Sequence, residues 1–212
     1  MTDKTDPMFN EAFNIIILGD TQTGKSNIFH KLSNKFNYNW DDTSKGTFLV
    51  DYMFTYDLLN NKTPLFLRLC DTGAGQACRT LLSSDIEQAN GIIVVYDITS
   101  RDSFMHVTDW LEQVKRSGNE GGKIMLIGNK CDLEQKRRVS YEEGRTLGEN
   151  LGIEFYEVSA KTTENMNKMS QSLWKKLLEA KKGEREERCR EDVLETLELS
   201  DKRCSCALCD LP

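Results

Sequence analysis

Apolar residues along the chain alternate between short continuous runs and longer runs with helical spacing. The short runs predict strands with these bounds: Phe13–Leu18, Phe48–Leu58, Leu65–Cys70, Gly91–Tyr96, Lys123–Gly128 and Ile153–Val158. The longer runs predict helices over Ser26–Ser33, Asp102–Lys115, Tyr141–Asn150 and Asn165–Lys182. Such alternation is typical of an α/β fold in which helices cover a parallel sheet.

Two details refine the predicted sheet. Four successive apolar residues, Ile92 to Val95, indicate a strand that is buried on both faces. Asn60-Asn61 predicts a hairpin turn, and Pro64 stands at the start of the following strand, where its missing N–H does least harm.

The two ends of the chain differ from its middle. Beyond Gly183 the charge density rises, and the few apolar residues give only a weak helical pattern. We therefore expect a solvated extension there, at most a marginal helix. The predicted organisation is an N-terminal extension over residues 1–12, one domain over 13–182 and a variable, flexible tail over 183–212.

Length and composition narrow the class of protein. A chain of 212 residues with 38% hydrophobic content is long enough for one compact domain plus a tail. No apolar run approaches the roughly 20 residues needed to cross a bilayer, and the N-terminus lacks a signal-peptide pattern, so a cytoplasmic location is expected. The net charge of −6 argues against a broad nucleic-acid surface.

The segment GDTQTGKS, Gly19 to Ser26, follows a predicted strand and leads into a predicted helix. Its glycines let successive backbone amides turn toward a phosphate chain. Lys25 supplies a cation for the β- and γ-phosphates, and Ser26 a hydroxyl for Mg²⁺. The expected phosphate contacts come from these loop residues and the next one: Gly19, Thr21, Gln22, Thr23, Gly24, Lys25, Ser26 and Asn27.

Two later segments select the base. In GNKCD, the Asp132 carboxylate can accept two hydrogen bonds from guanine, whereas adenine presents no such donor pair. Asn129 can brace the neighbouring loops, and the stem of Lys130 can cover the base. The segment VSAK leaves another strand and can offer a backbone N–H to the guanine carbonyl from among these residues: Ser159, Ala160 and Lys161.

With these motifs in this order, the sequence resembles the Ras superfamily of small GTPases, and most closely its Rab branch. The resemblance covers roughly residues 13–180 and rests on GDTQTGKS, TFLVDY, DTGAGQ, GIIVVYDIT, GNKCD and VSAK. It implies a P-loop G domain with a six-stranded sheet, parallel except for the second strand, and helices on both faces. It also implies GTP and GDP as ligands, Mg²⁺ as cofactor, and effector and exchange-factor proteins as partners.

The resemblance assigns further nucleotide and metal contacts. Thr47 matches the switch I threonine that binds Mg²⁺ and contacts the γ-phosphate, and Asp71 matches the carboxylate that reaches Mg²⁺ through water. Either Phe36 or Tyr38 is the candidate aromatic cover for the base.

Switch II departs from the family pattern, which reads D-T-A-G-Q-E where this chain reads DTGAGQ. Without gaps, Ala74 replaces the glycine that contacts the γ-phosphate, and Gly75 replaces the glutamine that orients the attacking water. Gln76 could take the catalytic role beside Lys25 if the loop brings it inward. Gln22, where the family usually has glycine, would hinder an arginine finger.

These departures predict a Rab-like switch that binds GTP and hydrolyses it slowly, acting in vesicle or membrane traffic. The alternative is a GTP-locked, non-hydrolysing binding module or scaffold. A P-loop kinase or ATPase is disfavoured by Asp132. Effector recognition should also differ, because Cys70 stands where a tryptophan is usual and Asp85-Ile86 replaces a tyrosine pair, although Tyr52 keeps an exposed aromatic.

The last nine residues hold three cysteines: Cys204, Cys206 and Cys209. Lipidation is the favoured interpretation, and an unmodified tail or a metal site are the alternatives. A lipidated tail would place the protein peripherally on the cytosolic face of an endomembrane or the plasma membrane. The two histidines, His30 and His106, are expected to be ordinary helix-surface or packing residues.

Overall fold

The computed structural model of the chain describes residues 11–34, 49–56, 64–71, 84–119 and 121–207. Its strands have these bounds: β1 (Glu11–Leu18), β2 (Leu49–Tyr56), β3 (Pro64–Asp71), β4 (Gly91–Asp97), β5 (Lys123–Asn129) and β6 (Glu154–Val158). Its helices are α1 (Lys25–Asn34), α3 (Arg101–Met105), α4 (Val107–Arg116), α5 (Tyr141–Leu151) and α6 (Met166–Ala207), with a 3-10 helix η1 (Cys131–Lys136). The chain divides into two compact units, Met1–Trp174 and Lys175–Pro212.

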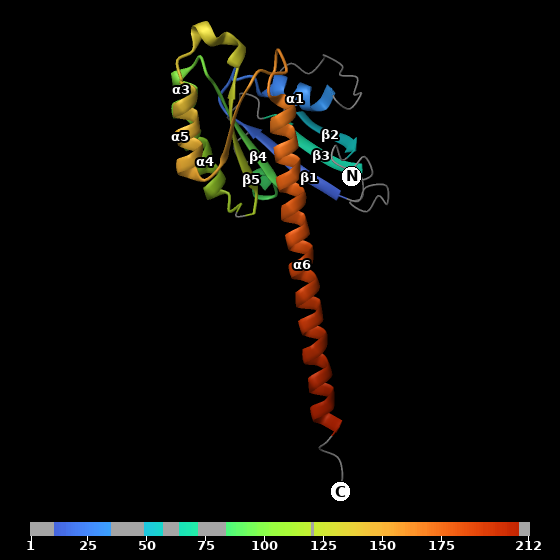
Figure 1. Cartoon of the computed structure of the whole chain (residues 1–212). Coiled ribbons are helices and arrows are strands. Elements are labelled where there is room, and N and C mark those ends of the chain that lie inside the picture. The colour runs from blue at the N-terminus through green and yellow to red at the C-terminus, as the bar shows by residue number, and fades with distance from the viewer. Residues whose placement is uncertain (1–10, 35–48, 57–63, 72–83, 120, 208–212) are drawn as a thin grey trace. The chain divides into compact units, whose positions relative to one another are not determined.

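Within the described residues, six strands form one sheet in the order β2-β3-β1-β4-β5-β6 (Figure 1). β2 runs antiparallel to β3, and all other neighbouring strands are parallel. The predicted α/β class is confirmed. The strand order reverses direction beside β1, so the carboxyl ends of β1 and β4 form the crevice where α/β sheets bind ligands.

In the described part of the sheet, β1 and β4 are buried on both faces. Every residue of β4 is buried, which confirms the prediction for this strand. On one face, Ile16 and Leu18 of β1 join a core cluster with Leu111 of α4. On the other face, Ile15 and Ile17 are equally buried, because successive strand residues point to opposite sides.

The predicted helix Asp102–Lys115 is in fact two helices, so that prediction is wrong in detail. Ser100 caps the first, its side chain accepting a hydrogen bond from the N–H of Ser103. His106, with ψ near −5°, ends α3 and begins α4. His106 is the single residue between the two helices: its N–H donates to the carbonyl of Asp102 in α3, and its own carbonyl accepts from the N–H of Trp110 in α4.

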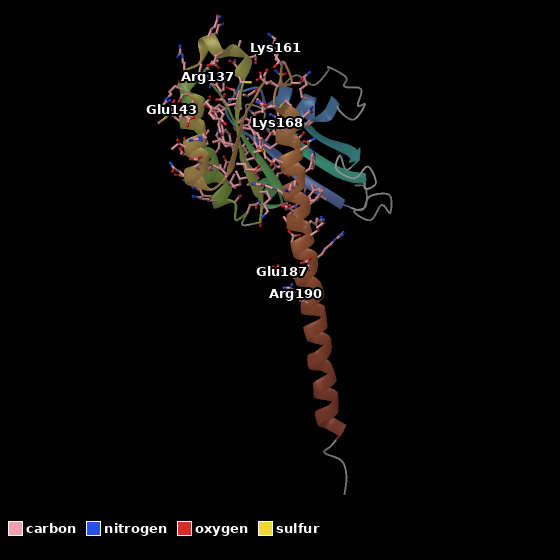
Figure 2. The ribbon with its side chains drawn as sticks, viewed as in Figure 1. Arg137, Glu143, Lys161, Lys168, Glu187 and Arg190 are labelled. Atoms are coloured by element: carbon pink, nitrogen blue, oxygen red, sulfur yellow. The ribbon has the colours of Figure 1, made fainter. Side chains whose placement is uncertain are left out.

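Helix α5 begins at a reciprocal cap. The Ser140 side chain accepts from the N–H of Glu143, and the Glu143 carboxylate accepts from the N–H of Ser140. Glu143 also forms an ion pair with Arg101, which links α5 to α3 (Figure 2). The two acidic residues of the first turn, Glu142 and Glu143, lie near the positive, N-terminal end of the helix dipole, and this placement stabilises the helix.

A largely buried ion pair fixes the segment after η1 to β6. Nη1 and Nη2 of Arg137, which is labelled in Figure 2, lie 2.7 and 2.8 Å from Oε1 and Oε2 of Glu157. The two contacts together form a bidentate ion pair, the geometry that guanidinium and carboxylate groups favour. The pair raises the pKa of Arg137, which also contacts Glu134.

The segment beyond Gly183, expected to be a solvated extension and at most a marginal helix, is helical in the structure, where α6 continues to Ala207. The reason lies in composition: residues 184–203 are rich in Glu, Arg, Lys and Leu, which have high helix propensity even without an apolar face. No helix in the described part of the chain combines the length and apolar character that crossing a membrane requires.

Candidate functional site

The loop after β1 has the backbone geometry of a phosphate-binding loop. Gly19 has φ +142°, and a Cβ there would lie 2.2 Å from the carbonyl oxygen of Val95. Gly24 has φ +91°, and a Cβ there would lie 2.3 Å from Nδ2 of Asn129. Both positions therefore require glycine, for conformation and for space.

A hydrogen bond holds the side chain of the loop lysine against the loop backbone. Lys25 is buried, and its Nζ donates to the carbonyl oxygen of Asp20 at 2.7 Å. The hydroxyl of Thr23 donates to the same carbonyl at 2.9 Å. Ser26 and Asn27 are exposed in the first turn of α1, where backbone N–H groups and the helix dipole favour an anion.

Gln22 adopts a conformation that side chains rarely take. Its φ is +64°, and its side chain is exposed beside Thr21, which is exposed as well. The left-handed region suits glycine, the residue that the resemblance leads us to expect there. The loop therefore keeps its shape despite the substitution, at an energetic cost of about 1 kcal/mol.

Asn129, at the end of β5, joins three segments of the site. Its Nδ2 donates to the carbonyl oxygen of Thr23 at 2.8 Å, and its Oδ1 accepts from the N–H of Ala160 at 3.2 Å. The side chain is buried, so both hydrogen bonds are shielded from water. The geometry shows Asn129 bracing the loops, as the sequence suggests.

Asp132, the predicted base-selecting carboxylate, is oriented by Ser159. The hydroxyl of Ser159 donates to Oδ1 of Asp132 at 2.6 Å, and the N–H of Thr162 donates to that hydroxyl oxygen at 3.0 Å. Ser159 is fully buried, whereas Asp132 is partly exposed and Lys161 is exposed. The contact of this segment with a guanine carbonyl stays a prediction.

Lys130 is anchored by a residue that the sequence reasoning missed as part of the site. Its Nζ lies 2.6 Å from Oδ2 of Asp97 and donates to the carbonyl oxygen of Gln22 at 2.7 Å. Asp97 is buried at the end of β4, and its Oδ1 accepts from both the N–H and the hydroxyl of Thr99. These contacts extend the stem of Lys130 across the mouth of the phosphate loop.

A second missed contact involves Asp20 of the loop itself. Nδ1 of His106 lies 2.6 Å from Oδ2 of Asp20, and Nε1–H of Trp110 donates to Oδ1 at 3.0 Å. The expectation of an ordinary surface histidine overlooked this pairing, since the partners are 86 residues apart. The side chain of His30 lies outside the described residues.

Cys131, inside the GNKCD segment, is no nucleophile. Its Sγ lies 3.7 Å from a carboxylate oxygen of Glu164. Partial burial and that carboxylate raise the pKa of the thiol to about 12, so it stays neutral at physiological pH. The chemistry of the site therefore lies in its phosphate and base contacts.

Several predicted residues cannot be placed. Thr47, Ala74, Gly75, Gln76 and Cys209 lie outside the described residues, as do Phe36 and Tyr38. Asp71 ends β3 opposite Ile17, and the cysteines at 204 and 206 lie in α6, but the side chains of all three are not described. Of the predicted Mg²⁺ ligands, only the Ser26 side chain is placed.

One predicted surface residue is misassigned. Ile86 is fully buried and belongs to the core cluster with Ala89 and Ile92, so it cannot contribute to an effector surface. Residues 84–87 are helical, and Ile86 lies on the side of this helix that faces the core. Asp85, partly exposed, is the member of the pair that can reach a partner.

The described residues fit a guanine nucleotide. The two glycines leave open the space that a Cβ would fill. Lys25 begins α1 after the loop that follows β1, and Asn129, Lys130 and Asp132 lie at or just beyond the carboxyl end of β5. Asp132 offers a second carboxylate oxygen beyond the one bonded to Ser159. Hydrogen bonds from Asn129 thus join the phosphate-binding loop to the base-binding segments.

Comparison with known proteins agrees with this geometry. The Ras family profile matches residues 14–179. The chain is 36% identical over 163 residues to the Ras-related protein RIC1 of Oryza sativa subsp. japonica, covering 77% of this chain and 79% of the relative. It is 34% identical over 172 residues to the Ras-related protein Rab-3C of Bos taurus, covering 81% and 74%. The chain belongs to the Ras family of small GTPases and is a GTP-binding switch protein of that family.

Proposed function

We propose that this chain is a Rab-like switch that binds GTP and GDP with Mg²⁺, hydrolyses GTP slowly and acts in vesicle or membrane traffic. The observation that carries the proposal is the double hydrogen bond of Asn129, to the loop at Thr23 and to the loop at Ala160. That side chain couples the phosphate loop to the base-binding segments, as a guanine-nucleotide switch requires.

Guanine selectivity follows from the carboxylate that Ser159 holds in place. A fixed carboxylate on Asp132 discriminates strongly, because a base without the matching donors leaves a desolvated anion unpaired. Mg²⁺, when bound, neutralises charge on the β- and γ-phosphates. Ser26, exposed in the first turn of α1, would supply one of its oxygen ligands, with Thr47 and, through water, Asp71 as the other proposed contacts.

Slow hydrolysis is supported by the sequence of switch II. Phosphoryl transfer depends on positioning a water and stabilising charge, and Gly75 has no side chain for the first task. Lys25 keeps the second task, while Gln76 would act only from a shifted loop position. Binding is therefore proposed to be intact and turnover to be impaired.

The proposed place of action is the cytosolic face of an endomembrane or the plasma membrane. Its support is the cluster Cys204, Cys206 and Cys209, which offers acceptors for lipid groups. The mixed charges of residues 181–203 provide no strongly basic surface, so two lipid chains would be needed for stable attachment. The exchange factors and effectors of such a switch would bind at its switch regions.

The test is nucleotide identification followed by single-turnover GTP hydrolysis on purified protein. A variant that restores DTAGQE carries these changes: Gly73→Ala, Ala74→Gly, Gly75→Gln and Gln76→Glu. We expect this variant to hydrolyse GTP roughly tenfold faster or more than the natural chain. A control with only Gly73→Ala and Ala74→Gly should show no such gain.

Each outcome has a distinct meaning. Equal rates for the natural chain and the restored variant would show that Gln76 already works, and slow hydrolysis would be wrong. Bound GTP with no measurable turnover would favour the locked binding module instead. Displacement of labelled GTP by equimolar ATP would contradict guanine selectivity.

A further inference from the structure

The carboxylate of Asp20 is held from outside the phosphate-binding loop. One oxygen is bonded to His106, at the junction of α3 and α4, and the other to Trp110 on α4. The main-chain carbonyl of the same residue holds Nζ of Lys25. Asp20 thus connects the lysine that meets phosphate to two side chains that belong to neither nucleotide motif.

Helix α4 gives this connection a rigid base. Val107, Leu111 and Val114 of α4 are buried, and Trp110 packs partly buried against the same core. A loop residue bonded at two points to a helix with this much buried apolar surface loses much of its freedom. The shape of the phosphate loop therefore depends on the α3–α4 junction.

We propose that His106 and Trp110 are positioning residues for the phosphate-binding loop, and that the charge on His106 controls how fast bound guanine nucleotide leaves. This inference rests on the proposed function. It adds a means of regulation at the same site, through a side chain that the nucleotide motifs do not include.

The charges around His106 all have the same sign. The hydrogen bond and charge of Asp20 raise the pKa of the imidazole, Asp109 of α4 and Asp102 of α3 raise it further, and only partial burial lowers it. The side chain is half exposed, so protons exchange with solvent directly. The pKa of His106 therefore lies above the ordinary value of an imidazole.

The direction of the effect follows from charge. Protonated His106 neutralises Asp20, whereas neutral His106 leaves a negative charge in the loop that must hold phosphates. Raising the pH through the pKa of His106 should therefore speed nucleotide release. One unit charge acting at roughly 8–10 Å through a nearly water-like dielectric, as suits a half-exposed side chain, changes such a rate by about two- to threefold.

The experiment measures release of a fluorescent GDP analogue, chased with excess GDP and Mg²⁺, at several values between about pH 6 and about pH 8.5. It compares the full natural chain with His106→Asn, a neutral side chain that can still donate to Asp20. Trp110→Phe removes only the indole N–H, and Met105→Ala changes an exposed neighbour that does not touch Asp20. Circular dichroism confirms that each variant is folded.

We expect His106→Asn to release GDP about two- to threefold faster than the natural chain at the acid end and to converge with it at the alkaline end. Trp110→Phe should speed release by a similar factor at every pH, and Met105→Ala should match the natural chain. Parallel pH profiles for the natural chain and His106→Asn would overturn the proposal, since a merely structural contact shifts the rate uniformly.

Failure of the proposed function is distinguishable from failure of this inference. A natural chain that binds no guanine nucleotide overturns both, whereas binding with an unchanged pH profile overturns only the role of His106. The imidazole signals in NMR give a second measurement, because the sequence has only two histidines. The signal that His106→Asn removes should titrate at a raised pKa, and Asp20→Asn should lower that pKa; an unchanged value would count against the proposal.

Discussion

Nδ2 of Asn129 donates to the carbonyl oxygen of Thr23 at 2.8 Å, across 106 residues of sequence. The pair joins the end of β5 to the phosphate-binding loop that follows β1, although β4 lies between these two strands in the sheet. Because the donor is buried, this hydrogen bond is shielded from water and helps to fix the relative position of the two loops. This preorganisation should be visible in both stability and nucleotide affinity.

Replacing Asn129 with alanine should lower both the stability of the nucleotide-free protein and its affinity for GDP. The change leaves the carbonyl of Thr23 and the N–H of Ala160 without their partner, a loss of about 1–3 kcal/mol in the free energy of unfolding. GDP affinity should fall roughly tenfold or more, since part of the binding energy must then order the loops. Urea unfolding and GDP titration measure the two effects.

A matched control for that change is Asn150→Ala. Asn150 is exposed near the end of α5, so its removal should leave both measurements within error. If Asn129→Ala also left the urea midpoint unchanged, the two hydrogen bonds would not be part of the empty protein's stability.

The nucleotide motifs were predictable from sequence because their chemistry is local. The segments that hold Gly19 and Lys25, and Asn129 and Asp132, each follow a predicted strand, and parallel strands bring such segments to one edge of a sheet. Asp97 was missed as an anchor because an acidic residue after a buried strand has many uses. Its role as an anchor is revealed only by the distance from Oδ2 of Asp97 to Nζ of Lys130 in the folded chain.

Long-range pairs and helix limits were less predictable. The bond between Asp20 and His106 depends on where α3 ends, and no local pattern marks that break. Ile86 was assigned to the surface by analogy, whereas its burial depends on packing under β4. The tail was predicted to be at most a marginal helix because its apolar pattern is weak, whereas helix propensity alone favours α6 through the charged segment.

Asp132→Asn should change the preferred base. The asparagine amide can donate where xanthine has a carbonyl in place of the exocyclic amine of guanine, and its oxygen still accepts from N1–H. We expect the preference for guanosine over xanthosine diphosphate to reverse, by roughly a hundredfold or more in relative affinity. Competition against a fluorescent analogue of each nucleotide measures it.

Ser159→Ala is the companion variant. It frees the Asp132 carboxylate without altering its chemistry, so GDP should bind more weakly while guanine remains preferred. A reversed preference in Ser159→Ala, or an unaltered one in Asp132→Asn, would contradict the assignment of Asp132 as the base-selecting group.

Gln22→Gly should stabilise the nucleotide-free protein. At φ +64° the backbone of Gln22 is strained, and glycine would relieve this strain. The relief should exceed the stability that is lost because glycine gives the unfolded chain more conformational entropy. The expected rise in the free energy of unfolding is about 0.5–1 kcal/mol. Urea unfolding of the nucleotide-free protein provides the measurement.

The adjacent residue supplies the control for this effect. Thr21 is exposed and does not share the positive φ, so Thr21→Gly should destabilise the protein through the unfolded state alone. Equal destabilisation by both glycine substitutions would show that Gln22 carries no conformational strain.

Glu143→Gln should alter the acid limb of the stability curve. The backbone hydrogen bond from Ser140, together with the side chains of Arg101 and Ser140, lowers the pKa of Glu143 to about 2 in the folded chain. Because the folded pKa lies below the ordinary value of 4.5, the ionised group contributes stability above that value. The contribution is lost as the pH falls from there through 2.

The urea midpoints of the natural chain and Glu143→Gln should therefore differ by a constant amount from neutral pH down to about pH 5, and converge as the pH approaches 2. Glu142→Gln is the matched control, because Glu142 lies beside it in the first turn of α5 but pairs with Arg145 of the same helix. Its midpoint should stay much closer to that of the natural chain. A gap for Glu143→Gln that persisted undiminished near pH 2 would mean that packing or capping geometry, rather than the ionised carboxylate, stabilises the start of α5.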